Sequence, residues 1–450
     1  MDYQYYLIID IVIVFTALWA LREWTTWSVF NPSLVYLAVH IYTVSLRGMQ
    51  LYYSQRPLPS FPGALSMDSI GRAIAASDIT LTAVVVASVL AANARKGGPT
   101  LLATRLRVGN PVHLLNRRVG HGIALVCLLF GSFCLLRFGA VATLQIAAGE
   151  DVNRLGLHVL ENTTLPFILG LYAIEGPLII MALYGVRRWT VLLYVALLIP
   201  TIYNVPRFAS VLSIFLVFLM YMNERGRRSL SWRWVALAVP VFVGWFFLKP
   251  VAAGLAAGND IETIASTVGQ YFAASTGDNV SADMQFLDMQ ACNMSLIDDY
   301  GKYFYGATYL PLLTVPIPRY TWPDKPSLSQ YYKEISTPDR PVGNTGMTPG
   351  ITGEAYVNFG LWGCFVLPFM MYWQFSRVYR RIVWSTPLSP KAWLFIVFLV
   401  SSLLVIRDGL MSLAVYPFLY YLPLTAFGVV SQLWIPKRRA RQLGGPPWPK

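Results

Sequence analysis

The sequence predicts an all-α integral membrane protein with about eleven transmembrane helices and one large loop on the outer side. Composition is the first observation: of 450 residues, 56% are hydrophobic and only 13% are charged. These values exclude the soluble globular classes. Apolar runs of roughly 15 to 22 residues, long enough to cross a bilayer as helices, recur along the chain. Basic and acidic residues also fall in alternate loops, as in multi-span proteins.

The apolar runs give the order of the elements. We expect spans at residues 5–21, 29–46, 74–94, 120–139, 165–185, 190–204, 209–223, 233–250, 356–375, 392–406 and 411–434. They divide the chain into a first membrane part (1–250, spans one to eight), the large loop (251–355), a second membrane part (356–436, spans nine to eleven) and a basic tail (437–450).

The charges orient these spans. The loop at residues 95–118 carries six Lys or Arg residues and no acidic residue, and four further basic clusters follow in register up to the C-terminal tail. Because cytoplasmic loops are enriched in Lys and Arg, we expect the C-terminus inside and the N-terminus outside. The net charge of +13 is therefore a sign of topology, and it predicts no nucleic-acid partner.

The large outer loop is the first place to look for chemistry. It contains PIPRYTWPDKP at 316–326 and runs into GMTPGITGEAYVNFGLWG at 346–363, with seven prolines between Pro311 and Pro341. That many prolines exclude one continuous helix and indicate an irregular path. Helical patterning at 261–275 and 281–299 predicts that other parts of the loop are helical.

Charged residues near the outer ends of spans are costly in lipid and are therefore candidates for function. Several guanidinium groups aimed at one place would suit a phosphate-bearing ligand, because arginine offers a planar, bidentate fork to phosphate oxygens. Each position has a plainer alternative, namely a side chain that snorkels to the interface or, for Arg407 beside Asp408, a local ion pair. The candidates are Arg137, Arg207, Lys249, Arg407 and Asp408 at span ends and Arg319, Lys325, Arg340 and Glu354 in the loop.

Glu354 is the sharpest single candidate. It follows Gly350 and Gly353 and precedes Gly360. It therefore lies where an irregular segment, whose backbone the glycines allow, meets the start of the ninth span. A catalytic carboxylate would suit this place. The alternative is that the carboxylate only caps the first turn of the helix and interacts with its dipole.

At these residues the chain resembles the Wzy-type polymerases of O-antigen and other oligosaccharide repeat units in bacterial envelopes. The resemblance covers the plan of many spans with one large periplasmic loop, and it is most specific in PIPRYTWPDKP and TGEAYVNFGLWG. It departs from the family where paired Arg-to-Gly spacings are described, because Gln330 and Ile351 stand eleven residues after Arg319 and Arg340.

The resemblance implies a GT-C-like glycosyltransferase in the bacterial inner membrane. It would transfer a growing glycan from undecaprenyl pyrophosphate to the non-reducing end of an incoming lipid-linked repeat unit at the periplasmic face. Arg137, Arg207, Arg319, Arg340 and Arg407 would bind the pyrophosphate, and Glu354, or failing that Asp408, would accept the hydroxyl proton. Sugar contacts would come from Tyr320, Trp322, Lys325, Tyr331, Tyr332, Tyr356 and Asn358.

Two other classes stay open. An O-antigen ligase would use the same donor, but the histidine-dependent loop site of those enzymes has no counterpart in this loop, which contains no histidine. A flippase or other transporter would need polar residues that continue to the cytoplasmic side. No Cys/His spacing typical of metal binding occurs. The resemblance implies a leaving group that is already an activated pyrophosphate, for which arginines can replace a cation, so we expect no metal and no other cofactor. The expected partners are the lipid-linked oligosaccharide, membrane lipid and a chain-length regulator.

Overall fold

The computed structural model describes residues 2–54, 65–93, 112–147, 170–204, 207–226, 286–314, 328–335, 350–382 and 390–433, with a few isolated positions in 259–269 and 317–326. Within these ranges every regular element is a helix, which agrees with the predicted class. The chain forms two compact units. The first comprises residues 1–99, 227–383 and 398–417, and the second comprises 100–226, 384–397 and 418–450.

Four described helices are long and apolar enough to cross a membrane, and a bent pair makes a possible fifth. They are Tyr3–Trp24 (α1), Met67–Asn93 (α4), residues Arg117–Arg137 of α5 (Val112–Ala147) and Gly350–Arg380 of α14 (Gly350–Ile382). This supports a helical membrane protein, and the remaining spans of the predicted eleven stay predictions. The span expected at 233–250 lies outside the described residues.

Helix α1 shows why these sequences suit lipid. Ile8, Val12, Phe15 and Trp19 form an exposed apolar stripe, whereas residues such as Leu7, Val14, Ala17 and Leu21 point into the protein. Both sets repeat at helical spacing, so one face packs and the other is available to lipid tails.

Three predicted spans are not single straight helices. The segment at 29–46 is α2 (Pro32–His40) followed by a π-helical stretch, η1 (Ile41–Ser45), and α3 (Leu46–Ser54). The segment at 392–406 breaks after α15 (Pro390–Ser402) and continues as α16 (Val405–Asp408). The segment at 411–434 is α17 (Met411–Val415), η5 (Tyr416–Tyr420) and α18 (Leu422–Leu433), with a bend of 84° between its halves.

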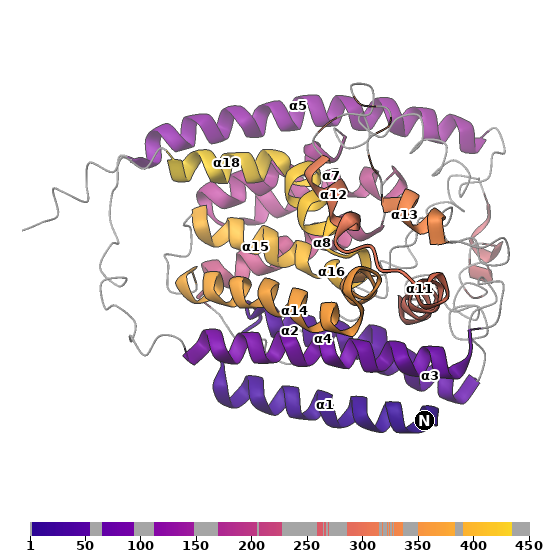
Figure 1. Cartoon of the computed structure of the whole chain (residues 1–450). Coiled ribbons are helices and arrows are strands. Elements are labelled where there is room, and N and C mark those ends of the chain that lie inside the picture. The colour runs from indigo at the N-terminus through magenta and orange to yellow at the C-terminus, as the bar shows by residue number, and fades with distance from the viewer. Residues whose placement is uncertain are drawn as a thin grey trace, which may run out of the picture. The chain divides into compact units, whose positions relative to one another are not determined.

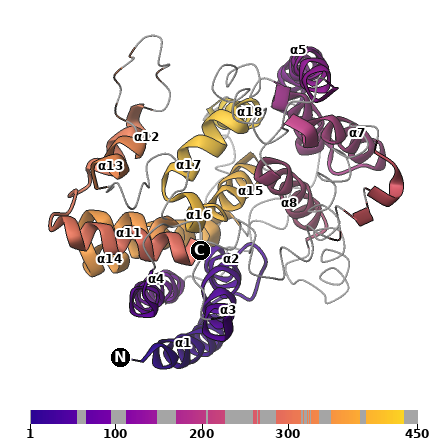
Figure 2. The same ribbon diagram turned by 90° about the vertical axis from the view of Figure 1, so that its right-hand side faces the viewer.

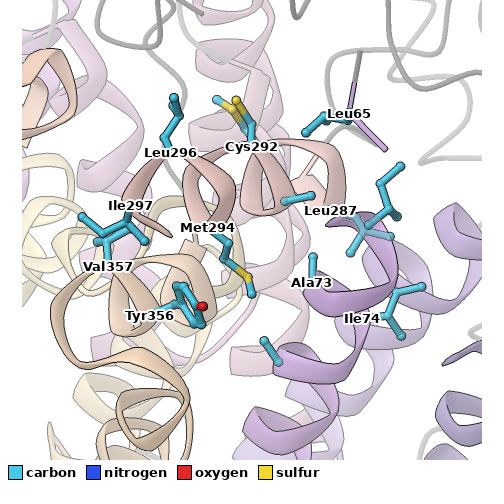
Figure 3. Packing of buried hydrophobic residues seen from close by; sticks show 14 of the residues in the cluster. Leu65, Ala73, Ile74, Leu287, Cys292, Met294, Leu296, Ile297, Tyr356 and Val357 are labelled. Carbon is cyan, nitrogen blue, oxygen red and sulfur yellow. The ribbon is translucent and has the colours of Figure 1, made fainter. Parts of the chain in front are cut away.

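In the first unit, α4 packs against α1, α14 and α11 (Phe286–Tyr300), as Figures 1 and 2 show. Figure 3 shows the apolar core between α4, α11 and α14, in which Met294 and Ile297 of α11 lie near Tyr356 and Val357 of α14. The large loop thus contributes α11 to the packed core.

A buried ion pair also ties α11 into this unit. Arg47 of α3 donates from Nε and Nη2 to the two carboxylate oxygens of Asp288 on α11, at 2.9 and 3.1 Å, and both side chains are almost fully buried. A bidentate pair in the interior fixes the position of α11 relative to α3, because separating its members would leave two buried charges unpaired.

The second unit contains α5, the helix Gly170–Tyr184, α7 (Arg188–Asn204), α8 (Arg207–Glu224) and α18. Its buried Glu175 accepts a hydrogen bond from the backbone N–H of Leu424, at 2.8 Å. Leu424 lies in the first turn of α18, so Glu175 satisfies a backbone N–H at the start of another helix of the same unit.

Candidate functional site

Glu354 lies in the second turn of α14 and is 1% exposed. Its Oε2 accepts a hydrogen bond from the backbone N–H of Leu410, at 2.8 Å. Helix α14 begins at Gly350, earlier than the ninth span predicted at 356. The carboxylate thus accepts its described hydrogen bond from the turn between α16 and α17. The capping alternative would instead have it bond to the first turn of its own helix.

Two glycines allow this approach. Both Gly350 (φ 64°) and Gly409 (φ 68°) have positive φ values, which favour glycine. A Cβ atom at Gly409 would lie 2.2 Å from Glu354 Oε2, and one at Gly350 would lie 1.9 Å from the carbonyl oxygen of Ile406. The start of α14 and the α16–α17 turn can meet only because both positions lack a side chain.

A third glycine, Gly360, interrupts α14. With φ 63° and ψ −154° it is non-helical and divides the element into two helices. An uninterrupted helix would pair the carbonyls of Val357 and Asn358 with N–H groups four residues later. Instead, the backbone N–H groups of Phe304 and Tyr305 donate to them, at 3.0 and 3.1 Å. The break thus creates the docking place for the segment at 303–309.

Asn358 fastens this segment to α14. Its Nδ2 donates to the Thr308 hydroxyl, at 2.5 Å, and to the carbonyl oxygen of Glu354, at 2.7 Å. Its Oδ1 accepts from the backbone N–H of Gly306, at 2.8 Å. The side chain is fully buried. Asn358 was predicted to contact sugar, but in the structure its amide is used to hold the loop.

Two tyrosines from the loop lie near the Glu354 carboxylate. Burial, followed by the charge of Glu354, raises the pKa of Tyr309 above its usual range. The same two causes, in the same order, raise the pKa of Tyr332 on α13 (Leu328–Ile335). The short helix η4 (Ala307–Tyr309) packs against both α13 and α14, so the two tyrosines and Glu354 belong to neighbouring elements.

Tyr356 belongs to a neighbouring polar group. Its hydroxyl donates to Asp298, at 2.8 Å, and Arg72 of α4 donates to the other carboxylate oxygen of Asp298, at 3.1 Å. The ring of Tyr303 meets that of Tyr356 edge to face, with 6.2 Å between centroids. This network joins α4, α11 and α14.

Arg407 and Asp408 form the ion pair that the sequence left as an alternative. Arg407 Nε lies 3.2 Å from Asp408 Oδ1, and both side chains are partly exposed. The guanidinium carbon also stands 5.6 Å from the centre of the Phe286 ring. Since Gly409 and Leu410 follow directly, this pair lies next in the chain to the two residues that contact Glu354.

The other predicted site residues are only partly placed. In the first unit, Tyr331 packs edge to face on Phe304, with centroids 5.5 Å apart, and Trp322 is exposed. Arg137, exposed on α5, and Arg207, the first residue of α8, belong to the second unit. Arg319, Tyr320, Lys325 and Arg340 lie outside the described residues.

Sequence reasoning missed Thr308 and Tyr309, which approach Asn358 and Glu354 only through the folded loop. No short-range pattern marks them. Gly409 could have been noticed, because a glycine directly after a charged pair at a helix end is typical of a positive-φ turn.

No family model, no curated protein and no solved structure matches this chain. The functional interpretation therefore depends on the residues themselves.

Proposed function

We propose that this membrane protein is a glycosyltransferase that polymerises oligosaccharide repeat units carried on a polyprenyl pyrophosphate, with undecaprenyl pyrophosphate as the carrier. The resemblance of its loop motifs to Wzy-type polymerases suggests this reaction. One structural observation supports it: Glu354 and the turn that follows Arg407 and Asp408 meet, although 53 residues separate Glu354 from Arg407 in the chain.

In the proposed reaction, a hydroxyl oxygen at the non-reducing end of the incoming unit attacks the anomeric carbon of the growing glycan. The bond from that carbon to the pyrophosphate oxygen breaks, and the lipid pyrophosphate leaves with the electron pair. Glu354 accepts the hydroxyl proton. A carboxylate held by one backbone N–H is already oriented for this step.

The leaving pyrophosphate needs cations. Arg407 is proposed to contribute to this contact, exchanging its partly exposed pairing with Asp408 for the phosphate oxygens. Ion pairs at the surface contribute roughly 0 to 1 kcal/mol of stability, and this pair is partly exposed, so the exchange should cost little. Tyr303, Tyr305 and Tyr331 provide aromatic faces on the loop side of the same unit.

The test is complementation of a strain that lacks the gene, followed by separation of its surface glycan on a gel. We expect the wild-type gene to restore long chains and Glu354→Gln to leave caps of a single repeat. Glu334→Gln is the matched control, because Glu334 is an exposed loop glutamate that accepts from the Tyr300 hydroxyl. It should restore long chains.

Purified enzyme in nanodiscs separates catalysis from stability. Glu354→Gln keeps the shape of the side chain but loses the proton acceptor, so turnover should fall by about 10²-fold or more while the lipid-linked substrate still binds. Turnover near the wild-type rate would move the base elsewhere. In the deletion strain, accumulation of polymer on the lipid would indicate a ligase, and untranslocated repeat units would indicate a flippase; either result contradicts the proposal.

A further inference from the structure

Asp10, His40 and Asp78 come from three helices of the first unit, α1, α2 and α4, and meet in its interior. One ligand-type atom from each side chain lies within 4.8 Å of the other two. His40 Nε2 is 3.0 Å from Asp10 Oδ1 and 3.6 Å from Asp78 Oδ1. Two carboxylates thus converge on one imidazole nitrogen.

This group is buried and short of hydrogen-bond partners. Asp10, His40 and Asp78 are 1%, 1% and 3% exposed. Among the described residues, Asp10 Oδ2, both carboxylate oxygens of Asp78 and His40 Nδ1 have no hydrogen-bond partner. A nitrogen carries at most one proton, so His40 Nε2 satisfies at most one of the two carboxylates. Buried polar atoms in such number point to a bound ligand that compensates them.

The charge balance is compatible with a bound cation. Two carboxylates face one imidazole, and the next basic residue along the chain, Arg47, is already bound bidentately to Asp288. Its remaining described bond, from Nη1, goes to Gln50. Two ionised carboxylates inside a membrane protein are costly unless protons or a cation compensate them, and a divalent cation would make the group neutral with a neutral His40.

We propose that Asp10, His40 and Asp78 bind a divalent first-row transition-metal cation, with Zn²⁺ the ion of choice. One imidazole nitrogen and two carboxylate oxygens form a common ligand set for such ions. Tetrahedral zinc bonds of about 2.0 to 2.1 Å place neighbouring ligand atoms about 3.3 Å apart. The two observed separations, 3.0 and 3.6 Å, lie on either side of this value.

The π-helical stretch η1 belongs to the same site. It begins directly after His40 and ends at Ser45, whose hydroxyl is buried beside Asp10. π-Helical turns inside α-helices are frequent at functional sites. Ser45 or a water molecule held by it would supply the fourth ligand.

The consequence of binding is a crosslink between α1, α2 and α4. In the predicted topology the three residues lie toward the outer ends of their spans, so the metal would hold these ends together. The three ligands are separate from Glu354 and Arg407, and the inference holds whether or not the proposed glycosyl transfer is correct.

Metal analysis of the purified protein tests the site without any assay of activity. The chain, prepared without a histidine tag, is stripped with chelator in detergent, reloaded with Zn²⁺ and washed. We expect about one zinc per chain in the wild type and close to none in Asp78→Asn. Asp68→Asn is the control, because it makes the same change at an exposed position of the same helix. It should keep the zinc.

A second measurement guards against a variant that does not fold. Zinc should raise the thermal unfolding midpoint of the stripped wild type and of Asp68→Asn by several degrees, since binding to the folded state alone stabilises it. X-ray absorption of the loaded wild type should show only nitrogen and oxygen ligands. Absence of stoichiometric zinc, sulfur in the first coordination shell, or retention of zinc by folded Asp78→Asn would overturn the proposal and leave a metal-free polar cluster.

Discussion

At the scale of single residues, the position of Glu354 depends on what its neighbours lack. The carboxylate oxygen occupies the space where a side chain at residue 409 would begin. Glycine at this place has φ 68° and ψ −163°, a backbone region that other residues adopt only at considerable cost. The geometry of the candidate site is thus encoded partly in a residue that performs no chemistry.

This gives a prediction for Gly409→Ala. The added methyl group should push Glu354 from the Leu410 N–H, lowering stability by about 2 to 4 kcal/mol from backbone strain and overpacking together. Polymer synthesis should fall with it. Thermal unfolding in detergent and glycan length in cells measure the two effects.

The matched control is Gly301→Ala. Gly301 also has a positive φ, 73°, but a Cβ there would meet no atom within 4 Å. Gly301→Ala should lower the free energy of unfolding only by the backbone strain, about 1 to 2 kcal/mol, and should keep activity. Equal losses in both variants would show that contact with Glu354 contributes nothing.

At the scale of elements, the break in helix α14 provides the place where a loop segment docks. The break at Gly360 releases carbonyl groups that the segment at 303–309 then satisfies. Because buried backbone groups must be paired, breaking one helix and docking the loop are two parts of the same structure.

We predict that Gly360→Ala releases the loop segment. Alanine is disfavoured at φ 63° and ψ −154°, so the helix should straighten and return the carbonyls of Val357 and Asn358 to its own ladder. Phe304 and Tyr305 would lose their acceptors, and their amide hydrogens should exchange about 10-fold faster or more.

Hydrogen exchange followed by mass spectrometry measures this. Gly226→Ala is the control, because Gly226 has the same φ, 63°, at the end of α8 with open space around it. It should leave exchange in the peptide that contains residues 303–306 unchanged. Unaltered exchange in Gly360→Ala would mean that the loop docks independently of the break.

At the scale of the whole molecule, the predicted orientation places the motif loop outside. A cysteine introduced at Ser327 should react with a membrane-impermeant thiol reagent in spheroplasts, and one introduced at Gly98 should not. The four native cysteines are buried and should contribute little background. Labelling at residue 98 alone would show that the topology is opposite to the predicted one. The motif loop would then lie in the cytoplasm and could not catalyse a reaction at the outer face.

Composition and periodicity sufficed to predict a helical membrane protein, and they located α1, α4, α5 and α14, with ends that differ from the observed ones by up to about eight residues. Local hydrophobicity determines such helices, because transfer of apolar residues to lipid depends little on their neighbours. It could not predict the breaks at Gly360, at residues 403–404 and around η5. At Gly360 and at η5 distant residues supply the donors, namely Phe304 and Tyr305 for the first and the Tyr172 hydroxyl for the second.

For the site, the sequence identified Glu354 and Arg407–Asp408 by their chemistry, since charge near an apolar span is rare and costly. Only the tertiary structure joined Glu354 to Leu410, assigned Asn358 to holding the loop and brought Asp10, His40 and Asp78 together. The physical reason is that partners 30 or more residues apart in the chain meet only when helices pack, and packing is decided by shape and by the pairing of buried polar groups.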